Sequence, residues 1–375
     1  MAPVPRVENM PAPRFPASIS ESNDGGDADG TAGSDANADA DANADAASGT
    51  DGDSSSGSMR AYRIAYDGTD YHGFQRQPSV PTVEGAIFAA LRSLGVFDPD
   101  AADDSGPAVR PAGYAAAGRT DKGVSAIAQT IAFEAPDWLT PRALNGELPA
   151  DVRAWAVADA PDGFHATHHA RRREYTYQLY APPLEDDTDG STPGGGSERR
   201  TPPIPPVAPA DAARVSDERI QAACRALSGE HDYHNLAADD DPDRTERSLT
   251  VEATRDGDYL VCTVEADGFA RQLVRRLVSL VREIGAGDSP LEKVDRVLAD
   301  EPLPGPEGVG PAPPEPLVLT GVEYPDPLEF RVDPVAAESA RDVFGARSVE
   351  RETGARVAGQ LAAGVDAPDV DSSLE

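Results

Sequence analysis

Lysine is almost absent from this chain of 375 residues. Only Lys122 and Lys293 are lysines, so nearly all of the 33 basic residues are arginines, while aspartate and glutamate together number 66 and give a formal charge of -33. This balance argues against a broad basic surface for nucleic acid, because contacts to phosphate normally come from lysine and arginine. Any contact with a polyanion is therefore expected from local clusters of arginine.

An acidic composition with little lysine is typical of proteins that work in concentrated salt. At molar ionic strength the Debye length falls to about 3 Å, so repulsion between surface carboxylates is screened and an acidic surface stays in solution. The alternative is an ordinary acidic protein with a disordered tail. Because the shortage of lysine extends through the whole chain, the composition favours a halophilic origin.

Cysteine and long apolar runs are also scarce. Cys224 and Cys262 are the only cysteines, too few for a disulfide framework and compatible with a reducing compartment. No segment approaches the roughly 20 apolar residues of a membrane span, and the N-terminus lacks the apolar region of a signal peptide. We therefore expect a cytoplasmic protein that does not bind a membrane.

Composition separates segments that can fold from segments that cannot. Residues 1–58 consist mainly of Asp, Ala, Gly, Ser and Asn, and we expect them to form a disordered acidic tail. The sequence leaves open whether translation begins at Met1 or Met59. A segment near 182–213, rich in Pro, Gly, Asp and Ser, predicts a disordered insertion, and residues 331–375 predict a C-terminal extension that is partly disordered.

Helix and strand patterns alternate in the remaining parts, residues 59–160 and 161–330, which we take as two subdomains. Strands are expected at 60–67, 129–134, 152–157, 172–180, 249–254 and 259–265. Helices are expected at 83–94, after the Thr140–Pro141 cap, at 216–227 and at 269–284, and from the capping box at 289–292. This mixture predicts an α+β fold.

Residues 117–126 (AGRTDKGVSA) contain the most informative carboxylate. Asp121 stands between an Arg-Thr pair and a Lys-Gly turn, directly before an apolar run that should be a strand. The end of a strand would hold this carboxylate at the edge of a cleft, where it could react. Taken alone, however, the segment could be an ordinary polar turn in which Asp121 bonds nearby backbone amides.

Other segments, in the same order along the chain, make residues 60–325 resemble the TruA family of tRNA pseudouridine synthases. Lys122 and Ser125 in the Asp121 motif look more like archaeal and eukaryotic members than bacterial ones, and Pro316 stands where the family usually has glycine. The segments are 66–77 (YDGTDYHGFQRQ), 143–152 (ALNGELPADV), 164–177 (FHATHHARRREYTY), 268–287 (GFARQLVRRLVSLVREIGAG) and 316–325 (PLVLTGVEYP).

The resemblance implies an α+β fold of two similar α/β-sandwich-like subdomains, with mixed or antiparallel sheets that meet at a central active-site cleft. It implies isomerisation of uridine to pseudouridine in the anticodon stem-loop of tRNA, at positions 38–40, without a cofactor. It also implies a homodimer. Other or broader uridine sites in tRNA, or an RNA-binding or RNA-folding protein, are the alternatives.

The resemblance also assigns roles to individual side chains. Asp121 would face the ribose anomeric carbon, either as a nucleophile or as the base that removes a ribose proton. The sequence does not distinguish these two roles. Arg275 would pair with Asp121, and Tyr175 would stack on the base and relay a proton, although a half-buried strand tyrosine is the plain alternative. Arg119 would help to flip the base.

Further arginines form local basic patches in this acidic chain. No acidic residue occurs between 269 and 282, a stretch that carries four arginines, and some of these are expected to contact phosphates. Residues 171–173 form a second patch. The candidate RNA contacts outside the Asp121 motif are Arg171, Arg173, Arg271 and Arg276.

Histidines gather in two places, residues 165–169 and 231–234. No cysteine or glutamate completes a familiar zinc spacing there. The sequence therefore predicts no metal site.

Overall fold

The computed structural model describes residues 57–98, 102–103, 106–107, 110–184, 214–238, 245–325 and 328–365. They belong to one compact unit, Ser54–Glu375. Nearly all of the acidic tail predicted at 1–58 and most of the insertion predicted at 182–213 lie outside the described residues.

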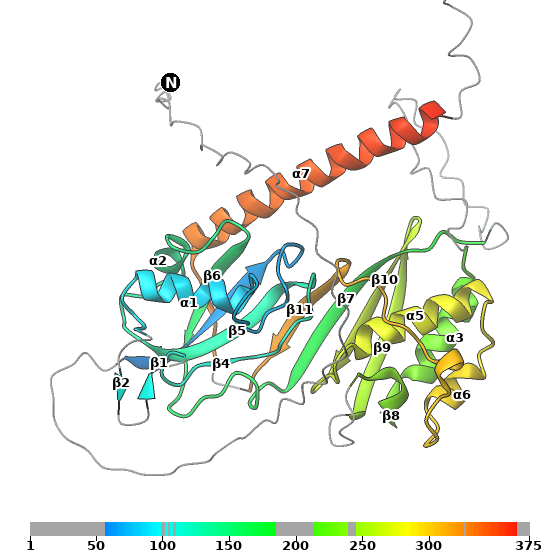
Figure 1. Ribbon diagram of the computed structural model, residues 1–375, viewed down its shortest axis with the longest axis horizontal. Helices are drawn as coiled ribbons and strands as arrows, with labels where there is room; N and C mark the ends of the chain where they lie inside the picture. The colour runs from blue at the N-terminus through cyan, green and yellow to red at the C-terminus, as the bar shows by residue number, and fades with distance from the viewer. Residues whose placement is uncertain are drawn as a thin grey trace, which may run out of the picture. The chain divides into compact units, whose positions relative to one another are not determined.

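A mixed sheet dominates the described part of the chain (Figure 1). Its strands lie in the order β12-β6-β1-β5-β11-β7-β10-β9-β8, with β4 beside β5. Neighbours are antiparallel except β11 and β5, which run parallel. The strands are β1 (Ser58–Tyr66), β4 (Ala115–Ala116), β5 (Ser125–Ala135), β6 (Val152–Asp159), β7 (Arg172–Tyr180), β8 (Gly229–Asp232), β9 (Glu246–Asp256), β10 (Tyr259–Ala266), β11 (Leu317–Glu323) and β12 (Arg331–Val332); β2 (Ala102–Asp103) and β3 (Gly106–Pro107) form a separate pair.

The strand order brings distant parts of the chain together. Strand β11 comes late in the chain, after β10, but in the sheet it lies between β5 and β7. Its Val318 is in register with Ser125 of β5 and with Thr176 of β7. Strand β5, which follows the Asp121 turn, and strand β7, which carries Tyr175, are therefore separated only by β11.

Apolar and aromatic side chains explain why the central strands form. Tyr62 of β1 stacks on Phe133 of β5 with 5.3 Å between ring centroids, an arrangement that favours neighbouring strands. Gln129 and Thr130 of β5 are also buried. The Gln129 amide donates to the carbonyl of Gly118 at 2.8 Å, so this buried polar group is satisfied and holds the segment that leads to Asp121.

Helices cover the sheet and connect its strands. Thr140 caps its helix as predicted, because its hydroxyl accepts a hydrogen bond from the amide of Ala143 at 3.1 Å. The helices are α1 (Val83–Ser93), α2 (Pro141–Asn145), α3 (Asp217–Leu227), α5 (Leu273–Ala286), α6 (Lys293–Val297) and α7 (Pro334–Val365), with short 3₁₀ turns η2 (His234–Leu236) and η3 (Gly305–Glu307).

The capping box predicted at 289–292 is wrong. Helix α6 begins at Lys293, and no side chain caps it. The Ser289 hydroxyl instead lies 3.2 Å from the Glu283 carboxylate at the end of α5, and the Lys293 ammonium binds the same carboxylate at 2.7 Å. The Ser289 hydroxyl thus donates to a carboxylate, whereas a capping box needs it to accept a hydrogen bond from the backbone amide three residues later.

Helix α5 packs its apolar face into the core as its spacing predicted. Leu273, Leu277, Leu280, Val281 and Ile284 are all buried. The helix begins four residues later than predicted, because Gln272 has a φ of 63°, a left-handed conformation that an α-helix does not accommodate.

Helix α7 was not predicted, although part of residues 331–375 was expected to be ordered. It is 32 residues long, and only Ala336, Ala337 and Ala340 are buried among its described side chains. These small residues pack the first turns against the sheet edge, but they form no apolar stripe that a sequence pattern detects. Residues 366–375 lie outside the described part. Among the described helices, none is both long enough and apolar enough to cross a membrane.

Candidate active site

Asp121 lies in the turn that joins β4 to β5. The turn closes when the Val124 amide donates to the Asp121 carbonyl at 3.2 Å, and Gly123 adopts a φ of 83°, which favours glycine. The Asp121 side chain keeps 27% of its surface exposed. The carboxylate is therefore partly enclosed but still open to a ligand.

Arg275 of helix α5 binds this carboxylate. Its Nη1 atom lies 3.1 Å from Oδ2 of Asp121, and its Nε donates to the carbonyl of Ala312 at 2.7 Å. Only 13% of the Arg275 side chain is exposed. Because the guanidinium is held at two points, it is fixed in an orientation that stabilises negative charge on Asp121. The predicted Asp121–Arg275 contact is thus present in the structure.

The segment before β11 fastens α5 in place. The Ala312 amide donates to the Arg275 carbonyl at 3.1 Å, and Arg276 donates to the carbonyl of Val309 at 2.8 Å. Pro314 packs over Gly123, where an added Cβ would meet it at 3.0 Å. Sequence reasoning assigned no role to residues 305–315; their density of proline and glycine was the available signal for a rigid, closely packed segment.

Tyr175 projects from β7 toward the Asp121 turn. An added Cβ on Gly118 would lie 3.9 Å from the Tyr175 hydroxyl, and Phe269 packs edge-on against the tyrosine ring with 5.1 Å between centroids. The pKa of Tyr175 is raised to about 12, chiefly by burial. The charge of Arg173 acts to lower this pKa, and the charge of Asp121 acts to raise it. Within the described residues its hydroxyl has no hydrogen-bond partner.

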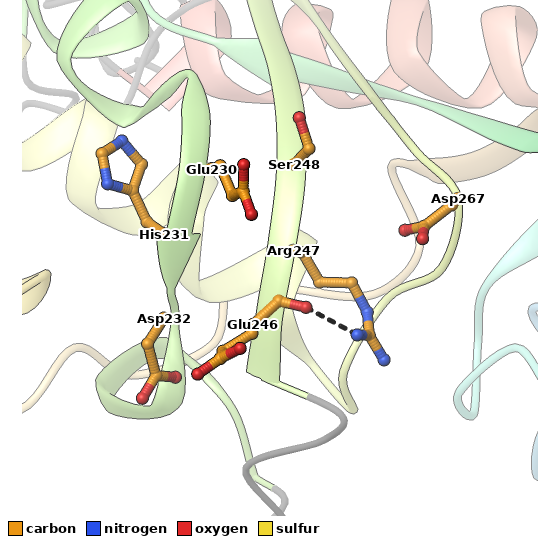
Figure 2. A pocket seen from close by; sticks show the side chains of 7 residues that line it. All are labelled: Glu230, His231, Asp232, Glu246, Arg247, Ser248 and Asp267. Atoms are coloured by element: carbon orange, nitrogen blue, oxygen red, sulfur yellow. Dashed lines mark hydrogen bonds between the residues drawn. The ribbon is translucent and has the colours of Figure 1, made fainter.

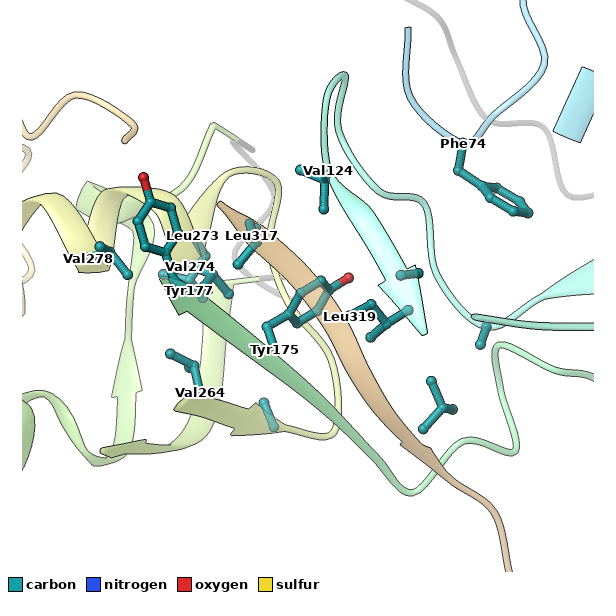
Figure 3. Packing of buried hydrophobic residues seen from close by; sticks show 14 of the residues in the cluster. Phe74, Val124, Tyr175, Tyr177, Val264, Leu273, Val274, Val278, Leu317 and Leu319 are labelled. Carbon is teal, nitrogen blue, oxygen red and sulfur yellow. The ribbon is translucent and has the colours of Figure 1, made fainter. Parts of the chain in front are cut away.

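Tyr177, two residues further along β7, faces the same side of the sheet. Figure 3 shows its ring beside helix α5, near Leu273 and Val274, whereas Tyr175 lies beside Leu319 of β11. Tyr177 is 2% exposed. The two tyrosines therefore differ: Tyr177 packs into the core beneath α5, and Tyr175 borders the Asp121 turn.

Two of the predicted RNA contacts are exposed. Arg119 and Arg171 lie on the surface, and neither side chain binds another described residue. Arg119 borders a hollow beside the Asp121 turn that contains two further arginines. The hollow is lined by Gln75, Arg76, Gln77, Pro78, Glu84, Phe88, Arg110 and Arg119. Sequence reasoning did not single out Arg76 or Arg110.

The other three predicted RNA contacts donate to the protein's own backbone. Arg173 is 8% exposed, and it donates to the carbonyls of Ala117 at 2.8 Å and Thr167 at 2.7 Å, as well as to that of Asp267. Arg271 donates to Ala238 at 2.8 Å. Arg276 binds Val309, as described above, and Gln272. Arg173 thus makes the most hydrogen bonds to the protein's own backbone among these three candidates.

A second hollow lies between β8 and β9, away from the Asp121 turn, and carboxylates dominate it (Figure 2). Such a lining does not favour phosphate. In the described part of the chain, no three His, Cys, Asp or Glu side chains are grouped so as to hold a metal ion. The hollow is lined by Glu230, His231, Asp232, Glu246, Arg247, Ser248 and Asp267.

The histidines at 165–169 organise their own turn. The His165 amide donates to Nδ1 of His169 at 3.1 Å, and Nδ1 of His165 accepts the amides of Thr167 and His168 at 3.3 Å. The rings of His165 and His168 lie 4.1 Å apart. These hydrogen bonds give the cluster a structural role.

Comparison with known proteins defines the family to which this chain belongs. Residues 223–325 match the family described as tRNA pseudouridine synthase. This match covers α5 and β11, and hence Arg275 and the segment that holds it.

Longer matches extend over most of the chain. It is 53% identical to tRNA pseudouridine synthase A of Natronomonas pharaonis, over 81% of this chain and 98% of the relative. It is 52% identical to that of Haloarcula marismortui, over 82% and 100%, and 31% identical to that of Methanococcoides burtonii, over 75% and 88%. The chain belongs to the tRNA pseudouridine synthase A family, as its motifs predicted, and the first two relatives come from halophilic archaea, which supports the halophilic origin.

Arg173→Met should destabilise the fold, because it leaves the buried Ala117 carbonyl and two partly buried carbonyls without this donor. A loss of about 3 kcal/mol is expected from the usual cost of unsatisfied buried groups. Urea denaturation in molar KCl measures it, and Arg171→Met, on the exposed neighbour, is the matched control with little change. Equal stability of the two variants would contradict the structural role of Arg173.

Proposed function

We propose that the site around Asp121 isomerises uridine in the anticodon stem-loop of tRNA, at positions 38–40. Membership of the family makes tRNA uridine the substrate, and the location in the stem-loop is the family role that the sequence resemblance implied. The observation that carries the assignment to this site is the hydrogen-bonded Asp121–Arg275 pair. It joins a partly open carboxylate to a fixed guanidinium beside an available tyrosine hydroxyl.

The reaction needs only groups that this site contains. The bond between the ribose anomeric carbon and N1 breaks, a bond to C5 forms, the C5 proton leaves and N1 gains a proton. Nothing is oxidised or reduced, so the chemistry requires no redox cofactor. Asp121 faces the anomeric carbon, where its charge opposes the positive charge that develops as the bond breaks. Attack on that carbon and removal of a ribose proton both remain open as its role.

Arg275 keeps Asp121 aligned while water is displaced by the RNA. A carboxylate that loses water needs another partner for its charge, and the guanidinium at 3.1 Å supplies one. The second hydrogen bond, to Ala312, prevents Arg275 from following the substrate instead. The pair is therefore suited to hold charge toward the ribose throughout the reaction.

Tyr175 would support the base once it has left its stack. Its pKa of about 12 keeps the hydroxyl protonated at neutral pH, so it would take up the C5 proton only while giving up its own. Because this hydroxyl has no hydrogen-bond partner among the described residues, it is suited to contact the substrate. Its position near Gly118 supports a place between Asp121 and the flipped base.

Exposed arginines would contact the phosphates around the flipped nucleotide. Arg119 and Arg171 have exposed side chains, whereas Arg271 and Arg276 already donate to backbone carbonyls and are weaker candidates. Arg173 is a weaker candidate, since its donors are already occupied. A few such contacts can suffice in concentrated salt only if the RNA surface is matched closely, since screening weakens distant attraction.

The resemblance further suggests two similar halves, residues 59–160 and 161–330, with the site where they meet. In support of this division, the first-half strands β6, β1 and β5 are neighbours in the sheet. The second-half strands β7, β10 and β9 are likewise neighbours. A homodimer that works in the cytoplasm belongs to the same proposal. Sedimentation equilibrium in molar KCl tests the dimer, which a monomer mass at all concentrations would exclude.

Asp121→Asn should abolish pseudouridine formation while tRNA still binds. The amide keeps the size of the side chain but loses the charge that must face the anomeric carbon, so the rate should fall by at least about 10³-fold. Mapping of pseudouridine in tRNA after incubation with each protein measures both rate and position. Asp162→Asn, which removes an exposed carboxylate elsewhere, is the control. Substantial turnover by Asp121→Asn would refute the assigned site, and modification outside 38–40 would redefine the target.

Tyr175→Phe should retain affinity for tRNA but lose turnover, because the ring still stacks while the proton relay is gone. Tyr177→Phe removes a hydroxyl from the same strand face and should leave the rate unchanged. Filter binding and single-turnover kinetics separate the two effects. If Tyr175→Phe reacted as fast as the native enzyme, Tyr175 would be confined to stacking or packing.

A further inference from the structure

Asp67 is a buried carboxylate that the proposed chemistry does not use. It follows β1 directly and is 9% exposed. Its Oδ1 accepts hydrogen bonds from the hydroxyl of Thr69 at 2.6 Å and from the Thr69 amide at 3.2 Å. Its Oδ2 accepts one from Arg351 of helix α7 at 2.5 Å. Arg347, one turn earlier on the same helix, lies 3.7 Å from the same oxygen.

These contacts keep Asp67 charged. Burial acts to raise its pKa, but the hydrogen bonds from Thr69 and Arg351 outweigh burial and hold the pKa below its ordinary value. Arg351 also donates to the Thr69 hydroxyl at 3.0 Å. Arg351 therefore closes a three-membered cluster with both side chains of the turn that follows β1.

The turn at Asp67 is packed directly against the strand that begins after Asp121. The Gly68 amide donates to the Ser125 hydroxyl at 3.0 Å. Gly68 lies so close to the Val124 carbonyl that any Cβ there would collide with it. A displacement of the turn must therefore displace the backbone just after Asp121.

The chain that continues from this turn forms the other wall of the Asp121 loop. Tyr71 accepts the Gly123 amide at 3.2 Å through its carbonyl, and the Phe74 amide donates to the Thr120 carbonyl at 3.0 Å. Gly73, with a φ of 95°, lies where a Cβ would come 2.9 Å from the same carbonyl. The Asp121 loop is thus bonded on both sides of Asp121 to the segment that Asp67 begins.

We infer that Arg351, assisted by Arg347, is a positioning residue for the reaction. It anchors helix α7 to the Asp67 turn, and this turn sets the backbone of the Asp121 loop against Arg275. The inference rests on the proposed function of Asp121. It gives helix α7 a role in catalysis. The first turns of α7 pack on the sheet through Ala336, Ala337 and Ala340, and the later turns bind the Asp67 turn through Arg351 and Arg347.

A positioning role has a kinetic signature that simple stabilisation lacks. A shift of the reacting group by about 1 Å can cost on the order of 100-fold in rate without weakening binding. Arg351 is 57% exposed as a side chain, so replacing it removes no core packing. Its loss should therefore affect kcat far more than it affects the melting temperature or KM for tRNA.

Arg351→Met in the full-length protein should lower kcat roughly ten- to hundredfold, with KM for tRNA changed by less than about threefold. Arg351→Lys, which keeps the charge, should recover part of the rate. Asp67→Asn should reproduce the loss from the other side of the contact. Arg356→Met is the matched control and should react at the native rate. Arg356 lies on the same helix, and among the side chains that the structure describes it pairs only with Glu352.

Three outcomes would overturn the inference. The first is an unchanged kcat for Arg351→Met. The second is a raised KM with unchanged kcat, which would make Arg351 an RNA contact. The third is a rate loss that accompanies a fall in melting temperature. Asp121→Asn measured in parallel separates the two proposals. An inactive Asp121→Asn beside a fully active Arg351→Met refutes the positioning role alone, whereas an active Asp121→Asn refutes the assigned site.

Discussion

The ion pair between Asp121 and Arg275 is the contact on which the site depends. Its partners are 154 residues apart in sequence, and neither lies in the core that would otherwise fix its position. Strand β11 brings their two regions together by pairing with β5 on one side and β7 on the other. The segment before β11 then binds Arg275 through Ala312 and packs Pro314 against Gly123. One strand and the loop that precedes it therefore set both the position and the orientation of the pair.

Acidic composition and RNA binding are reconciled by where the arginines lie. The formal charge of -33 belongs to the whole chain, but the surface beside Asp121 carries Arg119 and a hollow with Arg76 and Arg110. Other arginines of the predicted patches serve the fold, and Arg173 is the clearest case. The acidic hollow between β8 and β9 shows the opposite local balance. Local charge around the site, rather than net charge, is thus what the family's substrate would meet.

The sequence predicted most of the elements because their patterns are local. Alternation in residues 172–180 and helical spacing in 269–284 are properties of single segments; the strand formed as expected, and the helix formed from residue 273 onward. The Asp121–Arg275 contact was predicted only through resemblance, since no local pattern links residues so far apart. The late start of α5 depended on one strained residue, Gln272, and the false cap at Ser289 depended on a competing carboxylate, Glu283. Helix α7 was missed because alanines, not a hydrophobic stripe, pack it on the sheet.

The central claim is that Asp121 and Arg275 act as one catalytic unit, and a double-mutant cycle on the single-turnover rate tests it most directly. Asp121→Glu keeps the carboxylate but moves it, and Arg275→Lys keeps the charge but loses the hold on Ala312, so each single variant should remain slow but measurable. If the pair acts as a unit, the double variant should be within about threefold of the slower single variant, because effects within a catalytic unit are not additive. A double variant whose loss equals the product of the two single losses would contradict the account.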